Sequence, residues 1–418
     1  MSEMVVPDGW EIKQLDKFCD KVTDGTHDSP KRKNSGIRLV TSKNLLASGK
    51  LDLSSAYYIS EQDFVDIEKR SKVDVGDVIF GMIGTIGNPV VIYDLSVPFA
   101  IKNVALFKFS GDFDRARWVQ YYLDSDEFKL HIERSQTGNA QRFVGLGFLR
   151  NTIIPAPPIE EITKIASILT SVDEVIEKTQ SQINKLQYLK KGTMNELLTK
   201  GIGHTEFKDS PVGKIPKEWE VKKFGEIARV QGGYAFKSKD AQESGARWLK
   251  IANVGIGKVV WKDKSHLPPE FLTEHRDFVL RTGDIIVALT RPILNHKLKI
   301  AMVDTPDSGA LLNQRVGRIL SKTDVGVRFL YYLLKSEYSV GFIEKVIFGS
   351  DPPNISGQQI ESINFAIPSI QEQQKIASIL SSMDSHIEEK QRKLQQTQSL
   401  KKSLMQDLLT GKVRVTVN

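Results

Sequence analysis

The chain has 418 residues, of which 40% are hydrophobic and 26% are charged, and its 58 Lys and Arg against 51 Asp and Glu give a formal net charge of +7. This length predicts two or more domains. The longest apolar runs are strand-sized, which argues against a membrane-spanning helix, and the acidic start before Pro7 argues against a signal peptide. Cys19 is the single cysteine, which excludes a disulfide framework and a Cys-rich zinc site. We therefore expect a soluble, cytoplasmic, multidomain protein.

Two kinds of segment alternate along the chain. Short Val-, Ile- and Phe-rich runs separated by Gly, Pro, Asn and Asp predict irregular strands and turns in the first and third parts. Residues 159–200 and 370–411 contain no Pro and almost no Gly, which predicts two long helices. The expected organisation is a first domain over 1–155, a helical segment over 156–205, a second domain over 206–366, and a second helical segment with the C-terminal tail over 367–418.

The chain contains an internal repeat. The sequence of residues 164–169, Lys-Ile-Ala-Ser-Ile-Leu, recurs at residues 375–380, and Gly-Asp-Val-Ile at 76–79 returns as Gly-Asp-Ile-Ile at 283–286. These short motifs are repeated, whereas most of the residues between them differ in the globular parts. This pattern indicates duplication of one unit, consisting of a globular domain and a helix, followed by divergence.

Apolar residues in both helical segments follow the alternating three-and-four spacing of heptad a and d positions. A stripe this narrow is better suited to pairing with one other helix than to covering a core. Because one domain separates the two helices, we expect them to pair as an antiparallel coiled coil; the alternative is that each helix packs only on its own domain. The expected seam consists of Ile165, Leu169, Val172, Ile176, Ile183, Leu186, Ile376, Leu380, Met383, Ile387 and Leu394.

The order of the repeated motifs resembles a known family. Trp-Glu-(Ile/Val)-Lys, then Gly-Asp-(Val/Ile)-Ile, then Pro-x-Ile-x-Glu-x-x-Lys-Ile-Ala-x-Ile-Leu, each present twice, is similar to the specificity subunit of type I restriction–modification enzymes. Residues 23–30, Thr-Asp-Gly-Thr-His-Asp-Ser-Pro, resemble one class of target recognition domain. The resemblance extends over the whole chain.

The resemblance implies a fold and a function. The fold would be α+β, with two target recognition domains alternating with two paired helices in a pseudo-two-fold repeat. Each domain would read one half of a bipartite, asymmetric site in double-stranded DNA, and the helices would set the spacing. Two modification (methyltransferase) subunits carrying S-adenosylmethionine would dock on the helices, and restriction (motor-nuclease) subunits using ATP and Mg would join them. The chain itself would hold no cofactor and no metal, and would not be catalytic.

Three stretches superficially resemble catalytic motifs. Residues 7–13 contain the Pro-Asp and Glu-x-Lys of metal-dependent nucleases, but these carboxylates lie too close in sequence to converge from separate strands, and Lys217 stands at the Asp position in the second copy. Residues 351–354 resemble a methyltransferase loop but end in Asn354 instead of the aromatic that stacks on a flipped base. Residues 143–147 resemble a cofactor turn in the wrong context. A single-chain methyltransferase or nuclease remains the alternative, followed by a scaffold that binds only proteins.

Direct readout of bases requires forked donors or amides on exposed loops. Clusters of such residues occur at corresponding places in both halves, although an individual residue is more often a solvated charge or a phosphate contact. The candidate DNA-binding residues are Lys31, Arg32, Lys33, Asn34, Lys43, Asn44, Asn139, Gln141 and Arg142 in the first domain, and Lys237, Lys239, Arg247, Lys250, Asn253, Arg291, Asn295, His296, Lys297, Gln314, Arg315 and Asn354 in the second.

Overall fold

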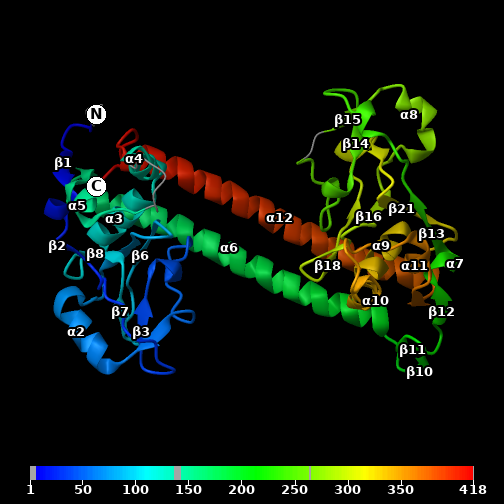
Figure 1. Ribbon diagram of the computed structural model, residues 1–418, viewed down its shortest axis with the longest axis horizontal. Helices are drawn as coiled ribbons and strands as arrows, with labels where there is room; N and C mark the ends of the chain where they lie inside the picture. The colour runs from blue at the N-terminus through cyan, green and yellow to red at the C-terminus, as the bar shows by residue number, and fades with distance from the viewer. Residues whose placement is uncertain (1–5, 136–142, 263–264, 418) are drawn as a thin grey trace. The chain divides into compact units, whose positions relative to one another are not determined.

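The computed structural model describes residues 6–135, 143–262 and 265–417. The chain forms two compact units, of which unit 1 comprises residues 1–181 and 391–418 and unit 2 comprises residues 182–390. The two long helices, α6 (Ile159–Thr199) and α12 (Ile370–Leu409), each pass from one unit into the other. Figure 1 shows both as continuous helices. Their bounds agree closely with the predicted ones.

The domain of unit 1 contains two small sheets and a strand pair. A four-stranded antiparallel sheet has the order β2-β8-β5-β6, and a three-stranded sheet has the order β4-β3-β7, in which β3 and β7 are parallel. The first and last strands, β1 and β9, pair with each other. The strands are β1 (Glu11–Gln14), β2 (Lys21–Asp24), β3 (Ile37–Val40), β4 (Tyr57–Ile59), β5 (Val78–Gly81), β6 (Gly87–Val91), β7 (Phe99–Ile101), β8 (Val104–Lys108) and β9 (Ile153–Ala156).

Both faces of the four-stranded sheet are buried. Phe80 and Phe107 point to the core shared with the helices, whereas Ile79 and Leu106 point to a second cluster that covers the opposite face. This alternation follows from the two-residue period of a strand. The helices of this domain are α1 (Leu15–Phe18), α2 (Glu61–Ser71), α3 (Phe113–Asp124), α4 (Asp126–Ser135) and α5 (Leu146–Asn151).

Unit 2 repeats this architecture. Its four-stranded sheet has the order β13-β21-β16-β19, its three-stranded sheet the order β15-β14-β20, and β12 pairs with β22 as β1 pairs with β9. The strands are β10 (Phe207–Ser210), β11 (Gly213–Pro216), β12 (Glu220–Lys223), β13 (Ala228–Gly232), β14 (Ala246–Leu249), β15 (His266–Leu267), β16 (Ile285–Ala288), β17 (Ile293–Leu294), β18 (Lys297–Leu298), β19 (Ile300–Met302), β20 (Leu311–Leu312), β21 (Val316–Ser321) and β22 (Asn364–Ile367). The helices are α7 (Phe224–Ile227), α8 (Phe271–Glu274), α9 (Val327–Lys335), α10 (Glu337–Ile347) and α11 (Gly357–Glu361).

The two long helices pair in antiparallel fashion, as predicted. In unit 2, Lys390 donates a hydrogen bond to Gln182 Oε1 over 3.0 Å, and Lys190 forms an ion pair with Asp384. Residue numbers therefore rise along α6 while those of the partners fall along α12. Lys390 interrupts the apolar seam of α12 in sequence, and this hydrogen bond satisfies its ammonium group there.

The seam residues are shielded from solvent in both units. Ile165, Leu169, Ile183, Ile376, Leu380 and Ile387 are buried, and Val172, Ile176, Leu186, Met383 and Leu394 are half-buried. Each helix also packs on a domain. In unit 1, Ile162 at the start of α6 and Leu408 at the end of α12 join the same core. Pairing and domain packing, which the sequence presented as alternatives, both occur. The described residues contain no helix that is long and apolar enough to cross a membrane.

Candidate nucleic-acid interface

A loop platform follows the first strand of the four-stranded sheet in unit 1. The amide of Thr26 donates to the carbonyl of Ile101 over 3.0 Å, and the amide of Asn103 donates to the carbonyl of Thr26 over 3.2 Å. A Cβ on Gly25 would collide with the carbonyl oxygen of Ile101, so only glycine permits this close approach. The turn before β8 is thereby held against the loop after β2.

Unit 2 contains the equivalent platform. The amide of Tyr234 donates to the carbonyl of Leu312 over 2.9 Å, and the amide of Gln314 donates to the carbonyl of Tyr234 over 3.0 Å. A Cβ on Gly233 would collide with the carbonyl oxygen of Asn313. The matching hydrogen bonds make Gln314 the counterpart of Asn103. The two domains thus present different side chains from loops joined by matching backbone hydrogen bonds, although only Asn103 of the two counterparts has a left-handed φ.

The platform of unit 2 borders an open pocket of about 430 Å³. Arg315 donates from Nη1 to Thr290 Oγ1 over 3.2 Å, and Thr290 in turn donates to Asn354 Oδ1. Gln314, Arg315 and Asn354 are all exposed. The pocket therefore combines a guanidinium and three side-chain amides, those of Gln314, Asn354 and Gln359, which are groups of the kind that read base edges. It is lined by Leu289, Thr290, Gln314, Arg315, Asn354, Ile355, Ser356 and Gln359.

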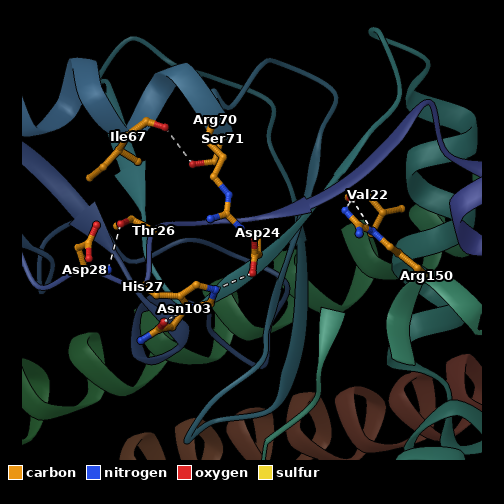
Figure 2. A network of polar contacts seen from close by, with 10 residues as sticks. All are labelled: Val22, Asp24, Thr26, His27, Asp28, Ile67, Arg70, Ser71, Asn103 and Arg150. Carbon is orange, nitrogen blue, oxygen red and sulfur yellow. Dashed lines mark hydrogen bonds and ion pairs between the residues drawn. The ribbon is translucent and has the colours of Figure 1, made fainter. Parts of the chain in front are cut away.

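The platform of unit 1 carries a polar network instead (Figure 2). The carboxylate of Asp24, whose side chain is 4% exposed, forms an ion pair with Arg70 and accepts a hydrogen bond from His27 Nε2 over 2.9 Å. His27 Nδ1 lies 3.0 Å from Asn103 Oδ1, and the imidazole is 53% exposed. Asn103 has a left-handed φ of 54°, which asparagine tolerates better than most residues. The network fixes a half-exposed imidazole and an amide side by side at the surface.

The candidate DNA-binding residues of the first domain are either exposed, buried, as Asn44 is, or outside the described residues. Lys31, Arg32, Lys33, Asn34 and Lys43 are exposed, as a DNA contact requires. The guanidinium of Arg32 lies over the ring of Tyr57, 4.7 Å from its centroid, which restrains its orientation. Burial raises the pKa of Tyr57, and the charge of Arg32 opposes that rise. The predicted residues Asn139, Gln141 and Arg142 lie outside the described residues.

The predictions for Asn44 and Asn253 are wrong. Asn44 is 4% exposed and Asn253 is fully buried. Asn44 Oδ1 accepts from the amide of Thr41 over 2.8 Å, and Asn253 Oδ1 accepts from the amide of Lys250 over 2.8 Å. Each is the third residue of a short 3₁₀ helix, Ser42–Asn44 or Ile251–Asn253, and completes a capping box with the residue before that helix. Asn44 Nδ2 donates to Ser55 Oγ over 3.0 Å and Asn253 Nδ2 donates to the carbonyl of Val260 over 3.1 Å, so both buried amides are engaged inside the domain.

Two further candidates in the second domain have internal roles. Arg247 donates to the carbonyl oxygens of Pro306 and Ser308, and its guanidinium lies 4.9 Å from the ring centroid of Trp261. Lys250 Nζ donates to Ser265 Oγ over 2.6 Å. These contacts engage both side chains within the domain.

The other candidates of the second domain are exposed: Lys237, Lys239, Arg291, Asn295, His296, Lys297, Gln314, Arg315 and Asn354. His296 is held by Glu344 of α10 at 2.9 Å. The amide of Arg291 donates to the carbonyl of Pro353 over 2.7 Å, which joins the loop after β16 to the loop that carries Asn354. The structure therefore brings Arg291, Gln314, Arg315 and Asn354 to one part of the domain surface.

The network of Asp24, His27, Arg70 and Asn103 did not appear among the predicted site residues. Its only sequence signal is the stretch at residues 23–30, because Arg70 and Asn103 are distant in the chain. Within the residues that the structure describes, no cluster of three or more His, Cys, Asp or Glu side chains could hold a metal ion.

Comparison with known proteins identifies the family. The model of the "Type I restriction modification DNA specificity domain" matches twice, at residues 7–188 and 216–398. The type I restriction enzyme MjaVIII specificity subunit of Methanocaldococcus jannaschii is 40% identical over 298 residues, covering 71% of this chain and 70% of that protein. The putative MjaX specificity subunit of the same organism is 26% identical over 98% of this chain and 95% of its own.

The fold agrees with solved structures. The crystal structure of a type I restriction–modification S subunit from M. genitalium matches with a TM-score of 0.60 at 14% identity, over 100% of this chain and 99% of that chain. A chain from a study of the assembly and conformational transition of a type I system matches with a TM-score of 0.56 at 14% identity, over 98% and 100% of the two chains. The chain belongs to the family of type I restriction–modification DNA specificity domains, with two copies of the domain. It is a specificity subunit, the non-catalytic DNA-recognition component of such a system.

Proposed function

We propose that the domain of each unit reads one half of a bipartite, asymmetric site in double-stranded DNA. The observation that carries this proposal is the repeated platform with different side chains, His27 and Asn103 in one copy and Gln314 and Arg315 in the other. A reader of two unrelated half-sites needs a constant scaffold to hold the chain on the duplex and variable side chains to select bases.

Both domains carry exposed cations in the loops near the platform segments in sequence. Lys31, Arg32 and Lys33 follow the platform loop of the first domain, and Arg291 and Lys297 lie in the β16–β18 segment of the second. Cations of this kind meet phosphates and hold a protein in register without reading sequence. We assign these residues mainly to phosphate contacts, with Arg32 and Asn34 as base-reading candidates.

We further propose that α6 and α12 set the spacing between the half-sites. Both are continuous helices that belong to both units, and their paired seam is shielded in each unit. A helix has a fixed rise of about 1.5 Å per residue, so a paired helix is a suitable element for defining a length. Half-sites read from one face of DNA are expected to lie about one helical turn apart, roughly 10 bp.

The chemistry is proposed to come from partner subunits. Two methyltransferase subunits would bring S-adenosylmethionine, and motor-nuclease subunits would use ATP and Mg²⁺, while this chain holds no cofactor. The related MjaVIII protein bears the name of a type I restriction enzyme's specificity subunit, which supports an assembly of this composition. We place the complex in the cytoplasm, together with its DNA substrate.

Selection from randomised DNA tests the proposal. The full chain, assembled with its cognate methyltransferase subunits, is incubated with a duplex library, and retained or methylated molecules are sequenced. We expect the selected sequences to share two blocks of fixed bases, separated by a constant number of bases of any sequence. A single continuous block, or no enrichment, would show that the two domains do not read separate half-sites. The chain without partners is also incubated with labelled S-adenosylmethionine; label transfer to DNA would favour the single-chain methyltransferase alternative.

A further inference from the structure

We infer that Asn103 is a specificity-determining residue of the first half-site, and that His27, Asp24 and Arg70 position it. This inference rests on the proposed function and names the base-reading group within it. The ligand is the major-groove edge of a base pair. Asn103 occupies the platform position that Gln314 occupies in unit 2, where Gln314 lines the pocket together with Arg315 and Asn354.

The amide of Asn103 is held by a contact with the imidazole. It lies 3.0 Å from His27 Nδ1, and Figure 2 shows its other end directed away from the ring. An asparagine amide carries a donor and an acceptor group, which is the pair that reads N6 and N7 of adenine in the major groove. Fixing the amide in advance removes the side-chain entropy that an unrestrained asparagine would lose on binding.

The residues that hold Asn103 extend from the surface into the interior of the domain. His27 is half-exposed, but Asp24, to which its Nε2 donates, is buried, and Asp24 is in turn paired with Arg70 of α2. A buried carboxylate bonded to the imidazole fixes the orientation of the ring, and through it that of the amide in contact with its other nitrogen. Unit 2 has Gly232 and Ala235 at the positions of Asp24 and His27, so the common scaffold does not require this network. If the two domains read different half-sites, the residues that select bases should differ between them, and this network is present in only one.

The variant that tests the role of Asn103 is Asn103→Gly. Glycine adopts the left-handed φ of this position without strain, so the loop is retained while the amide is removed. The assembled complex is titrated against the cognate site and against duplexes in which each base pair of both half-sites is changed in turn. We expect the discrimination ratio at one or two positions of the first half-site to fall by about 5- to 150-fold. Ratios across the second half-site are expected to stay unchanged, which controls for folding and assembly.

The positioning role is tested by His27→Ala and by the double variant. If His27 acts through Asn103, His27→Ala lowers the ratio at the same positions, and it has no further effect in the Asn103→Gly background. Additive losses would overturn the positioning role. Unchanged discrimination across the first half-site in Asn103→Gly would overturn the inference itself while leaving the bipartite function in place. If the wild-type complex selects no bipartite site, the proposed function fails independently of these variants.

Discussion

The hydroxyl of Tyr121 donates a hydrogen bond to Asp173 Oδ2 over 2.9 Å, which joins α3 of the first domain to α6. The other oxygen of the same carboxylate forms an ion pair with Lys401 of α12 at 2.7 Å, and the ammonium of Lys401 lies 5.3 Å from the centroid of the Tyr121 ring. One carboxylate therefore connects a domain to both long helices. The contact defines the register of α6 against α12 within unit 1.

The same arrangement occurs in unit 2 with the helices exchanged. Tyr332 of α9 donates to Asp384 Oδ2 of α12 over 2.8 Å, and Lys190 of α6 pairs with Asp384 Oδ1. Burial lowers the pKa of Lys190, as does the nearby charge of Lys335, while Asp384 opposes both effects. The retention of this triad in both copies, despite divergence elsewhere, indicates that it is part of the scaffold.

Replacing Asp384 by Ala is therefore expected to destabilise unit 2. The change leaves the largely buried ammonium of Lys190 and the hydroxyl of Tyr332 without their carboxylate partner, at a cost of about 1–3 kcal/mol in the free energy of unfolding. Denaturant unfolding followed by circular dichroism measures this loss of unfolding free energy. Glu196→Ala is the control, because Glu196 at the end of α6 and its partner Lys200 just beyond the helix are both well exposed, and such pairs contribute about 0–1 kcal/mol. Equal losses in the two variants would contradict a special role for Asp384.

Glu161 predicts a pH-dependent stability in unit 1. It accepts from Trp10 Nε1 over 3.2 Å and from Arg414 Nε over 2.9 Å. The hydrogen bond and charge of Arg414 hold the pKa of Glu161 below its ordinary value of 4.5. The ionised carboxylate therefore stabilises the fold above its ordinary pKa, and this stabilisation disappears as the pH falls through the lowered folded-state pKa.

The variant Glu161→Gln is thus expected to be less stable than the wild type at neutral pH and to converge with it in acid. Thermal unfolding at a series of pH values measures the difference. The exposed Glu206, which is paired with Lys217, supplies the matched variant Glu206→Gln, whose difference from wild type is expected to be small throughout. A Glu161→Gln difference that does not change with pH would contradict the assigned role of the ion pair.

Asn44→Ala and Asn253→Ala are expected to lower stability without altering base preference. Each substitution removes the amide that accepts from the backbone N–H of the residue before a 3₁₀ helix, and leaving that group unsatisfied costs about 1–3 kcal/mol. The comparison is Asn34→Ala on the exposed loop, where stability should be retained and cognate binding weakened if the amide reads a base. Unfolding curves measure the loss of stability, and binding titrations against cognate and scrambled duplexes measure the loss of base preference. A change of base preference in Asn253→Ala would show that the buried amide influences the interface.

Arg32→Ala is expected to weaken binding to the cognate site by about 1–3 kcal/mol if Arg32 reads a base. Its guanidinium is exposed and already oriented by Tyr57. The ratio of cognate to scrambled affinity is the measurement, with Lys69→Ala, on the exposed face of α2, as the control. An equal loss on both duplexes would assign Arg32 to a phosphate.

Lengthening both helices tests the proposed spacing role. Seven residues are inserted near Thr179 in α6 and seven near Gln395 in α12, so that the heptad seam is preserved. At about 1.5 Å per residue this adds roughly 10 Å, equivalent to about three base pairs at 3.4 Å each. Methylation is expected to shift to sites whose spacer is longer by about that number. Methylation that still requires the original spacer would show that the helices do not define it.

Much of the fold could be predicted because its signals are local or repeated. The absence of proline and the a/d spacing located α6 and α12, and the single domain between them indicated antiparallel pairing. The candidate site was only partly predictable. Asn44 is a residue type that can read bases, yet its side-chain oxygen accepts a hydrogen bond from the backbone amide of Thr41, three residues earlier. Such local hydrogen bonds to the backbone are common for asparagine. His27 and Asn103, 76 residues apart, form a pair that no spacing rule reveals.

Sequence alone was sufficient for the duplicated organisation, the two helices and their seam, because periodicity and repetition are properties of residues close together or copied along the chain. Which polar side chains face solvent and which ones support them depends on contacts between distant strands and loops. Gly25 meets the turn before β8, Asp24 meets Arg70, and Asn253 turns inward, and each of these follows from packing and burial in the folded chain. The candidate DNA-reading surface that we propose could therefore be assembled only from the folded domains.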